Sequence, residues 1–129
     1  MFTRRLVLAA FVSPILLAPV VAQQSGFTRT PLKTLDFPAG YTTVSAITEI
    51  APNSSLGRHT HPGVDTGYVL EGELVLLVDG KPEQRLKAGD SYQNPAGVPH
   101  DARNIGDKPV RLFTVLTIEK GKPLTSPAQ

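Results

Sequence analysis

The sequence predicts an all-β fold in a single domain, either a sandwich or a closed barrel of short strands. Two observations carry this prediction. After residue 22, no segment of useful length repeats its apolar residues with the 3.6-residue period of a helix, and a glycine or a proline recurs every few residues. Short apolar or alternating segments between such turn residues are typical of antiparallel strands. A chain of 129 residues has room for one ordinary core.

Eight segments are expected to form the strands. In chain order they are 29–36, 42–50, 67–70, 73–78, 84–86, 91–93, 99–103 and 110–118. The sharpest turn signal between them is Asp79-Gly80, because this pair tolerates the positive φ values of a two-residue type I′ hairpin. The ends, 23–27 and 120–129, are polar and contain prolines, and we expect them to be loose tails or arms.

The first 22 residues are expected to be a signal peptide. Arg4 and Arg5 precede the apolar run 6–22, which ends in small residues up to Ala22. The alternative is an uncleaved membrane anchor, although a serine and two prolines interrupt the run and about 20 apolar residues are needed to span a bilayer. A twin-arginine signal is an alternative to the general export signal. We expect the mature domain, 23–129, to be periplasmic or secreted.

Removal of the signal peptide leaves a chain near neutrality. Lys and Arg fall from 13 to 11, which equals the number of Asp and Glu, all of which follow the signal. No run of Lys and Arg remains to bind phosphates or an anionic membrane surface, so neither nucleic acid nor a membrane is an expected partner. The absence of cysteine excludes disulfides, thiolate metal ligands and cysteine nucleophiles.

The three histidines carry the functional argument. His59 and His61 lie two positions apart, so on an extended strand both side chains point to one face, about 6.6 Å apart. His100 follows the rigid turn sequence 95–99 and is expected to start a new strand that brings a third imidazole to the pair. Three imidazoles with open positions suit one divalent transition metal, and Fe, Mn, Ni, Co, Cu and Zn all remain open. The alternative is that the His-x-His pair is a surface accident.

Both histidine segments resemble the two sequence motifs of the cupin superfamily. In the first motif, His61 is followed after three residues by Asp65 and after six more by Gly72. Asn53 stands where the family has a leading glycine, and Asp65 stands where it has a glutamate ligand. The second motif is matched at every fixed position, by Gly89, Pro95, Gly97, His100 and Asn104. The resemblance covers about residues 42–119.

This resemblance implies a cupin-type jelly-roll β-barrel with one metal ion inside, held by His59, His61 and His100. The barrel interior would be a mostly apolar pocket for a small organic ligand or substrate. Because aspartate is one methylene shorter than glutamate, three interpretations of Asp65 remain open. It is a direct metal ligand, a residue that holds a water or an imidazole beside the ion, or a solvated loop residue.

Other residues near the motifs have weaker interpretations. Asn104 is expected to be a structural turn residue. Tyr68, Tyr92, Gln93 and Asn94 lie on strands that border the expected pocket, but strand alternation lets only one side of each strand face it. The sequence does not decide which side that is.

Two classes of function remain open. In the first, the metal activates a small substrate as a Lewis acid, in a dioxygenase-like oxidoreductase or in an isomerase, decarboxylase or hydrolase. In the second, the domain holds a metal or a small ligand without turnover. Because many small cupins are dimers, we also expect a homodimer, in which the arm 27–36 adds a strand to the partner's sheet and covers its edge.

Overall fold

Eleven strands make up the fold, and the computed structural model describes residues 26–129. The strands are β1 (Phe27–Leu35), β2 (Tyr41–Ile50), β3 (Ser54–Ser55), β4 (His59–Thr60), β5 (Gly63–Glu71), β6 (Glu73–Val78), β7 (Gln84–Lys87), β8 (Ser91–Asn94), β9 (His100–Asn104), β10 (Val110–Glu119) and β11 (Ser126–Pro127). The predicted signal peptide lies outside the described residues. Within residues 26–129, no helix is long and apolar enough to cross a membrane.

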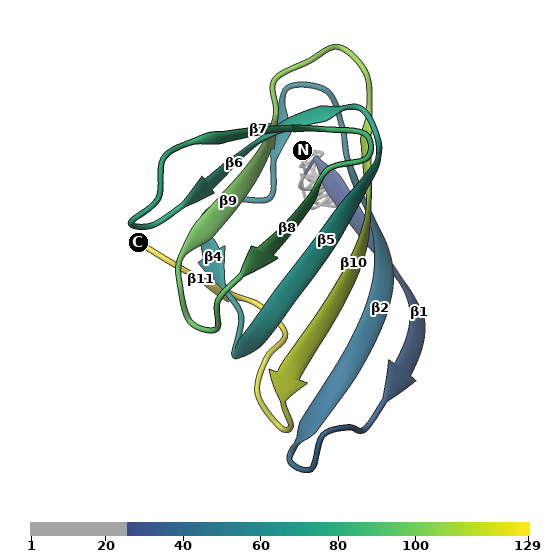
Figure 1. Ribbon diagram of the computed structural model, residues 1–129, viewed down its shortest axis with the longest axis vertical. Helices are drawn as coiled ribbons and strands as arrows, with labels where there is room; N and C mark the ends of the chain where they lie inside the picture. Colours follow the sequence, from purple (N-terminus) through teal and green to yellow (C-terminus); the bar gives the residue numbers. More distant parts are fainter. Residues whose placement is uncertain (1–25) are drawn as a thin grey trace, which may run out of the picture.

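The strands form two antiparallel sheets that face each other (Figure 1). One sheet has the order β1-β2-β10-β5-β8, and the other has the order β11-β4-β9-β6-β7, with β3 paired to β9. Apart from the consecutive pairs β1-β2 and β6-β7, neighbours in each sheet are separated in sequence, as β2 and β10 are, which is the pattern of a jelly roll. The predicted all-β jelly-roll barrel is therefore confirmed.

All eight predicted strands are present, and their ends differ from the prediction by at most four residues. The largest difference is in β5, which begins at Gly63 rather than Gly67. Both glycines lie inside the strand because a neighbour approaches closely. A Cβ on Gly63 would lie 1.8 Å from the carbonyl oxygen of Thr117, and one on Gly67 would lie 2.2 Å from the ring of Tyr92. The two-residue strands β3, β4 and β11 were not predicted.

The type I′ hairpin predicted at Asp79-Gly80 is wrong. The last pair of the β6–β7 ladder is Leu76 with Gln84, so the connection is longer than two residues. Gly80 has φ 76°, but Asp79 is not among the residues with positive φ, and a type I′ turn requires both. The end of β6 pairs with β9 instead, and the Asp79 carboxylate accepts a hydrogen bond from the guanidinium of Arg58 at 2.6 Å.

The two asparagines of the family motifs have structural roles. Asn53 has φ 53°, in the left-handed region that glycine and asparagine tolerate best, which explains how it replaces the expected glycine. Asn104 is fully buried, and its amide nitrogen donates to the carbonyl oxygens of Ile50 at 3.0 Å and Lys108 at 2.7 Å. The structural role predicted for Asn104 is confirmed.

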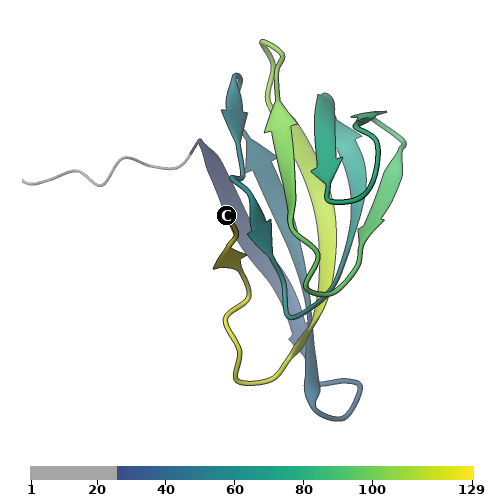
Figure 2. The ribbon, with the colours of Figure 1, turned by 90° about the vertical axis from the view of Figure 1, so that its left-hand side faces the viewer.

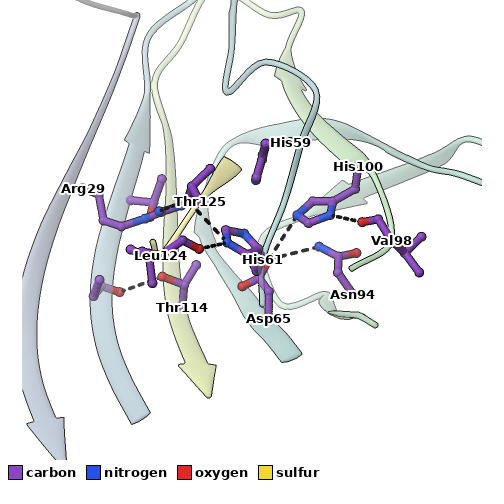
Figure 3. A network of polar contacts seen from close by, with 12 residues as sticks. Arg29, His59, His61, Asp65, Asn94, Val98, His100, Thr114, Leu124 and Thr125 are labelled. Carbon is purple, nitrogen blue, oxygen red and sulfur yellow. Dashed lines mark hydrogen bonds and ion pairs between the residues drawn. The ribbon is translucent and has the colours of Figure 1, made fainter. Parts of the chain in front are cut away.

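The space between the sheets has an apolar part and a polar part. The apolar part is formed by Ile50, Val69, Leu74, Leu76, Val78, Tyr92, Ala102, Val110 and Leu112. The polar part surrounds the three histidines and contains the buried side chains of Asp65, Asn94 and Thr114 (Figure 3). The expectation of a mostly apolar interior is therefore only partly met, because polar side chains fill the region around the histidines.

Of the two expectations for 120–129, a loose tail or an arm, the loose tail is wrong, and we call this segment, which pairs with the sheet, the strap. After β10 the strap turns back beside β4, as the yellow end of the chain shows in Figure 2. There β11 pairs with β4, with Pro127 opposite His59. Arg58 Nε donates to the carbonyl oxygen of Gln129 at 2.7 Å, and the amide of Ala128 donates to the carbonyl oxygen of Arg58 at 3.0 Å. These bonds hold the strap against β4, because they give its backbone groups partners in the sheet in place of water.

Candidate metal centre

The structure brings the three histidines together inside the barrel. His59 lies on β4, His61 directly follows it, and His100 begins β9 opposite His59. The ring centroids are 4.8 Å apart for His59 and His61, 4.4 Å for His59 and His100, and 5.1 Å for His61 and His100. All three side chains are buried, which excludes the alternative that the His-x-His pair is a surface accident.

The turn of the second motif is bound directly to the first motif. The backbone amide of Gly97 donates to the carbonyl oxygen of His61 at 2.9 Å, so the turn before His100 is held against the strand that carries the other two imidazoles. The two motifs are far apart in sequence. Their contact explains why both spacings are needed to build one site.

Each imidazole donates a hydrogen bond from Nδ1 to a backbone carbonyl oxygen. The acceptors are Gly57 for His59 at 2.5 Å, Leu124 for His61 at 2.7 Å and Val98 for His100 at 2.9 Å. A carbonyl oxygen can only accept, so the proton of each neutral ring is on Nδ1 and the Nε2 lone pair is free. This is the tautomer in which Nε2 binds a metal.

The electrostatic environment keeps the imidazoles of His59 and His61 neutral. Burial lowers the pKa of His59 and lowers the pKa of His61 to about 4, although hydrogen bonds to the carbonyls of Gly57 and Leu124 act in the opposite direction. Near neutral pH both rings are therefore uncharged. An uncharged imidazole has the lone pair that coordination requires.

Asp65 lies beside the histidines and not in a solvated loop. It is on β5 with a buried side chain, which excludes the third of the interpretations left open by the sequence. Its Oδ2 atom lies 4.0 Å from Nε2 of His61 and 3.7 Å from Nε2 of His100. The amide of Asn94 donates to the same oxygen at 3.0 Å, so the carboxylate is held in a fixed direction (Figure 3).

The donor set fits one divalent transition metal. Two atoms bound to one ion at about 2.1 Å can be at most about 4.2 Å apart, and the distances from Asp65 to His61 and His100 are within this limit. The ligand atoms of the three histidines lie within 4.8 Å of one another, so the widest pair must close by about 0.6 Å for one ion to bind both. In addition, Nε2 of His61 and Nε2 of His100 are buried without a hydrogen-bond partner among the described residues, a cost that coordination would remove.

Of the four strand residues that bordered the expected pocket, Tyr92 and Asn94 face the interior, whereas Tyr68 and Gln93 are exposed. Burial and the nearby charge of Asp65 raise the pKa of Tyr92, so its hydroxyl group keeps its proton. A surface cavity lined by β6, β7 and the turn after β9 lies at the far end of β9 from His100. That cavity is separate from the metal centre.

Sequence reasoning missed the contribution of the strap. Leu124 acts through its backbone carbonyl oxygen, which carries no side-chain signature, and the side chain of Thr125 lies 3.4 Å from Nδ1 of His61. Asn94 was among the candidates, but its inward direction was not predicted. Its position two residues after Tyr92 puts both side chains on one face of the strand, but does not show which face is the inner one.

The fold and the site geometry define a cupin, and comparison with known families agrees. The family model of the Cupin domain matches residues 46–116, more than half of the chain. The chain therefore belongs to the cupin family.

Three similar proteins are enzymes by name. H2HPP isomerase of Bacillus subtilis is 30% identical over 92 residues, 67% of this chain and 39% of the isomerase. Dimethylsulfoniopropionate lyase DddQ of Ruegeria pomeroyi is 36% identical over 69 residues, 54% of this chain and 32% of the lyase. The polyketide cyclase RemF of Streptomyces resistomycificus has a TM-score of 0.64 and 25% identity, covering 81% of this chain and 72% of the cyclase. This chain thus spans less than two fifths of the two curated relatives.

Proposed function

We propose that this protein is a metal-dependent enzyme that acts on a small organic molecule. In this proposal His59, His61, His100 and Asp65 hold one divalent transition metal, with Fe, Mn, Ni, Co, Cu and Zn as the candidate ions. The observation that carries the proposal is the hydrogen bonding of the imidazoles. All three Nδ1 atoms donate to carbonyl oxygens, which leaves the Nε2 atoms free, and the ligand atoms of the three rings lie within 4.8 Å of one another.

The residues around the ion support proton-transfer chemistry. When bound, such an ion acts as a Lewis acid and lowers the pKa of a coordinated hydroxyl or enol group. Tyr92 keeps its proton, so its hydroxyl group is a hydrogen-bond donor inside the barrel. Asn94 fixes the carboxylate of Asp65, and the strap covers the histidine side of the centre and limits the access of water.

The names of the three similar enzymes above favour a reaction without net oxidation. Isomerases, lyases and cyclases rearrange, eliminate or close a substrate, and metal-assisted proton transfer is sufficient for such steps. We therefore favour an isomerase or lyase reaction. The dioxygenase reaction expected from the sequence stays a prediction, and a binding module without turnover is the remaining alternative.

The metal centre is tested by replacing each ligand separately. His59→Ala, His61→Ala and His100→Ala should each lose most of the metal occupancy, measured by titration of metal-free protein with Zn²⁺ or Co²⁺ against a chromophoric chelator. Their effects should not add, because the site acts as a unit. Thr60→Ala lies between two of the ligands and is the matched control. Wild-type affinity in His100→Ala would contradict the metal centre, because the chain has only three histidines.

The reaction class is tested with and without oxygen. A panel of small enolisable keto acids and hydroxy acids is incubated with metal-loaded protein in air and under argon, and products are measured by NMR. Equal turnover in both atmospheres supports the isomerase or lyase reaction. Turnover that requires oxygen supports the dioxygenase instead, and no turnover of any compound supports the binding module.

We also propose that the chain is exported and cleaved after residue 22, so that the mature protein begins at Gln23. The basis is the sequence pattern of residues 1–22. Intact-mass measurement of the protein from a periplasmic or extracellular fraction tests this. A full-length mass in the soluble fraction would contradict the proposal.

A further inference from the structure

Arg29 points into the barrel from the edge strand β1. It lies opposite Thr48 on β2, and directly paired residues in antiparallel strands project to the same face. The side chain of Thr48 is fully buried in the interior, and Arg29 is partly buried. The side chain therefore lies on the inner face of the sheet, half-buried, with Nε beside the buried Thr48 and Nη1 reaching the exposed Thr125 of the strap.

Among residues 26–129, Arg29 is the only arginine without a carboxylate partner. The other four arginines form ion pairs: Arg58 with Asp79, Arg85 with Glu83, Arg103 with Asp101, and Arg111 with Glu49 and Glu71. Arg29 donates only to two hydroxyl groups, from Nε to Thr48 Oγ1 at 3.3 Å and from Nη1 to Thr125 Oγ1 at 3.5 Å. The half-buried guanidinium thus has no charge partner among the described residues, and its remaining donors are free to bind an anion.

The unpaired guanidinium lies next to the metal centre. Thr125, which accepts its hydrogen bond, also lies 3.4 Å from Nδ1 of His61, so a single residue separates the arginine from a proposed ligand (Figure 3). The positive charge also contributes to lowering the pKa of His59 and acts on that of Tyr92, which places the charge within electrostatic range of both groups. The cation therefore lies beside the metal centre, on the inner side of the sheet, with Thr125 between them.

The charges around the metal centre favour an anion. A divalent ion with neutral imidazoles and the single carboxylate of Asp65 keeps a net positive charge, and Arg29 adds a further one. A guanidinium presents a planar fork of donors that matches the two oxygens of a carboxylate. A carboxylate on the substrate would supply the missing partner for Arg29 and offset the excess charge.

We propose that Arg29 binds a carboxylate group of the substrate while another oxygen of the same molecule reaches the metal centre, so that the substrates are small organic acids. This inference rests on the proposed function. It assigns Arg29 to substrate recognition and not to metal binding, and the two roles are separated in the test.

The test measures binding of malonate, a small dicarboxylate, to the Co²⁺-loaded protein by calorimetry and by the change in the Co²⁺ absorption spectrum. Arg29→Gln should weaken malonate binding about 10- to 100-fold, as expected for the loss of hydrogen bonds to a charged group. Lys33→Gln is the matched control, because it removes a positive charge from the exposed part of the same strand. It should bind malonate like the wild type, and malonamide, which is neutral, should bind much more weakly than malonate.

The outcomes separate this inference from the proposed function. If wild-type protein does not bind Co²⁺, the proposed function fails. If Arg29→Gln binds Co²⁺ and also binds malonate like the wild type, the carboxylate role of Arg29 is wrong, and inorganic phosphate binding more tightly than malonate would overturn the carboxylate class. Should Arg29→Gln not fold, Arg29→Lys decides, since it keeps the charge without the planar fork. Weaker malonate binding then supports the inference, and wild-type binding contradicts it.

Discussion

The carboxylate of Asp65 is expected to depend on Asn94, and a double-mutant cycle measures that dependence. Asn94 donates to Asp65 Oδ2 at 3.0 Å, and both side chains are buried, so this single bond fixes the oxygen that lies 3.7 Å from Nε2 of His100. A buried hydrogen bond to a charged group contributes about 1.5–3 kcal/mol. Asn94→Leu should therefore lower metal affinity about 10- to 100-fold.

Asp65→Ala should lower metal affinity at least as much as Asn94→Leu, because a bound oxygen is lost. In Asp65→Ala, Asn94 has no carboxylate left to orient, so adding Asn94→Leu should cause little further loss, and the double variant should resemble Asp65→Ala. The coupling energy is then about 1.5–3 kcal/mol. Affinities come from chelator competition with Zn²⁺, and Gln93→Ala, on the exposed face of the same strand, is the control. Additive losses would refute the reasoning, because Asn94 would then act independently of Asp65.

Three further predictions concern stability and assembly. In metal-free protein, unfolded His61 gains a proton below pH 6.5 whereas the folded residue gains it near pH 4, so the free energy of unfolding should fall by about 3 kcal/mol between these values. Equal urea midpoints at about pH 7 and about pH 4.5 would contradict this. Gly63→Ala should lower the melting temperature, because its Cβ would lie 1.8 Å from a carbonyl oxygen of β10, and an unchanged melting temperature would be evidence against that contact. The expected homodimer is tested at the exposed Leu32 and Leu35 of β1: lysine at both positions should give monomers in sedimentation, and an unchanged species would exclude this edge as the interface.

The sequence predicted those features that depend on residue type and spacing. Glycines and prolines between apolar segments indicated the boundaries of all eight longer strands. This signal is local, because a turn favours these residues whichever strands pair with each other. The spacing of His59, His61 and His100 predicted their convergence, because two lie on one strand face and the third begins a strand after a rigid turn. Asp65 was placed near them only by the resemblance to the cupin motif, and a solvated loop position was one of its three interpretations.

Features that depend on strand register and on backbone atoms were not predicted. Arg29 faces the interior only because β1 pairs with β2 in one register, which shifts between Pro31 and Lys33. The carbonyl oxygen of Leu124 can orient an imidazole whatever the side chain, so no residue type marks it. To predict that Asn94 points inward, one must know which face of β8 lies against the interior, and a four-residue strand is too short to show this from its sequence.

The hydrogen bond from His61 to Leu124 makes metal capture depend on a local folding equilibrium. The bond joins residues 63 positions apart, and the strap that supplies the carbonyl is held mainly by β11 and a few bonds to Arg58. If the strap is docked in only a fraction of the molecules, the apparent dissociation constant of the metal increases by the inverse of that fraction. Linkage makes the effect reciprocal, so a bound ion must favour the docked strap by the same free energy. Hydrogen exchange at the amide of Ala128, which docking buries against the carbonyl of Arg58, would therefore report metal binding at a distance from the ion.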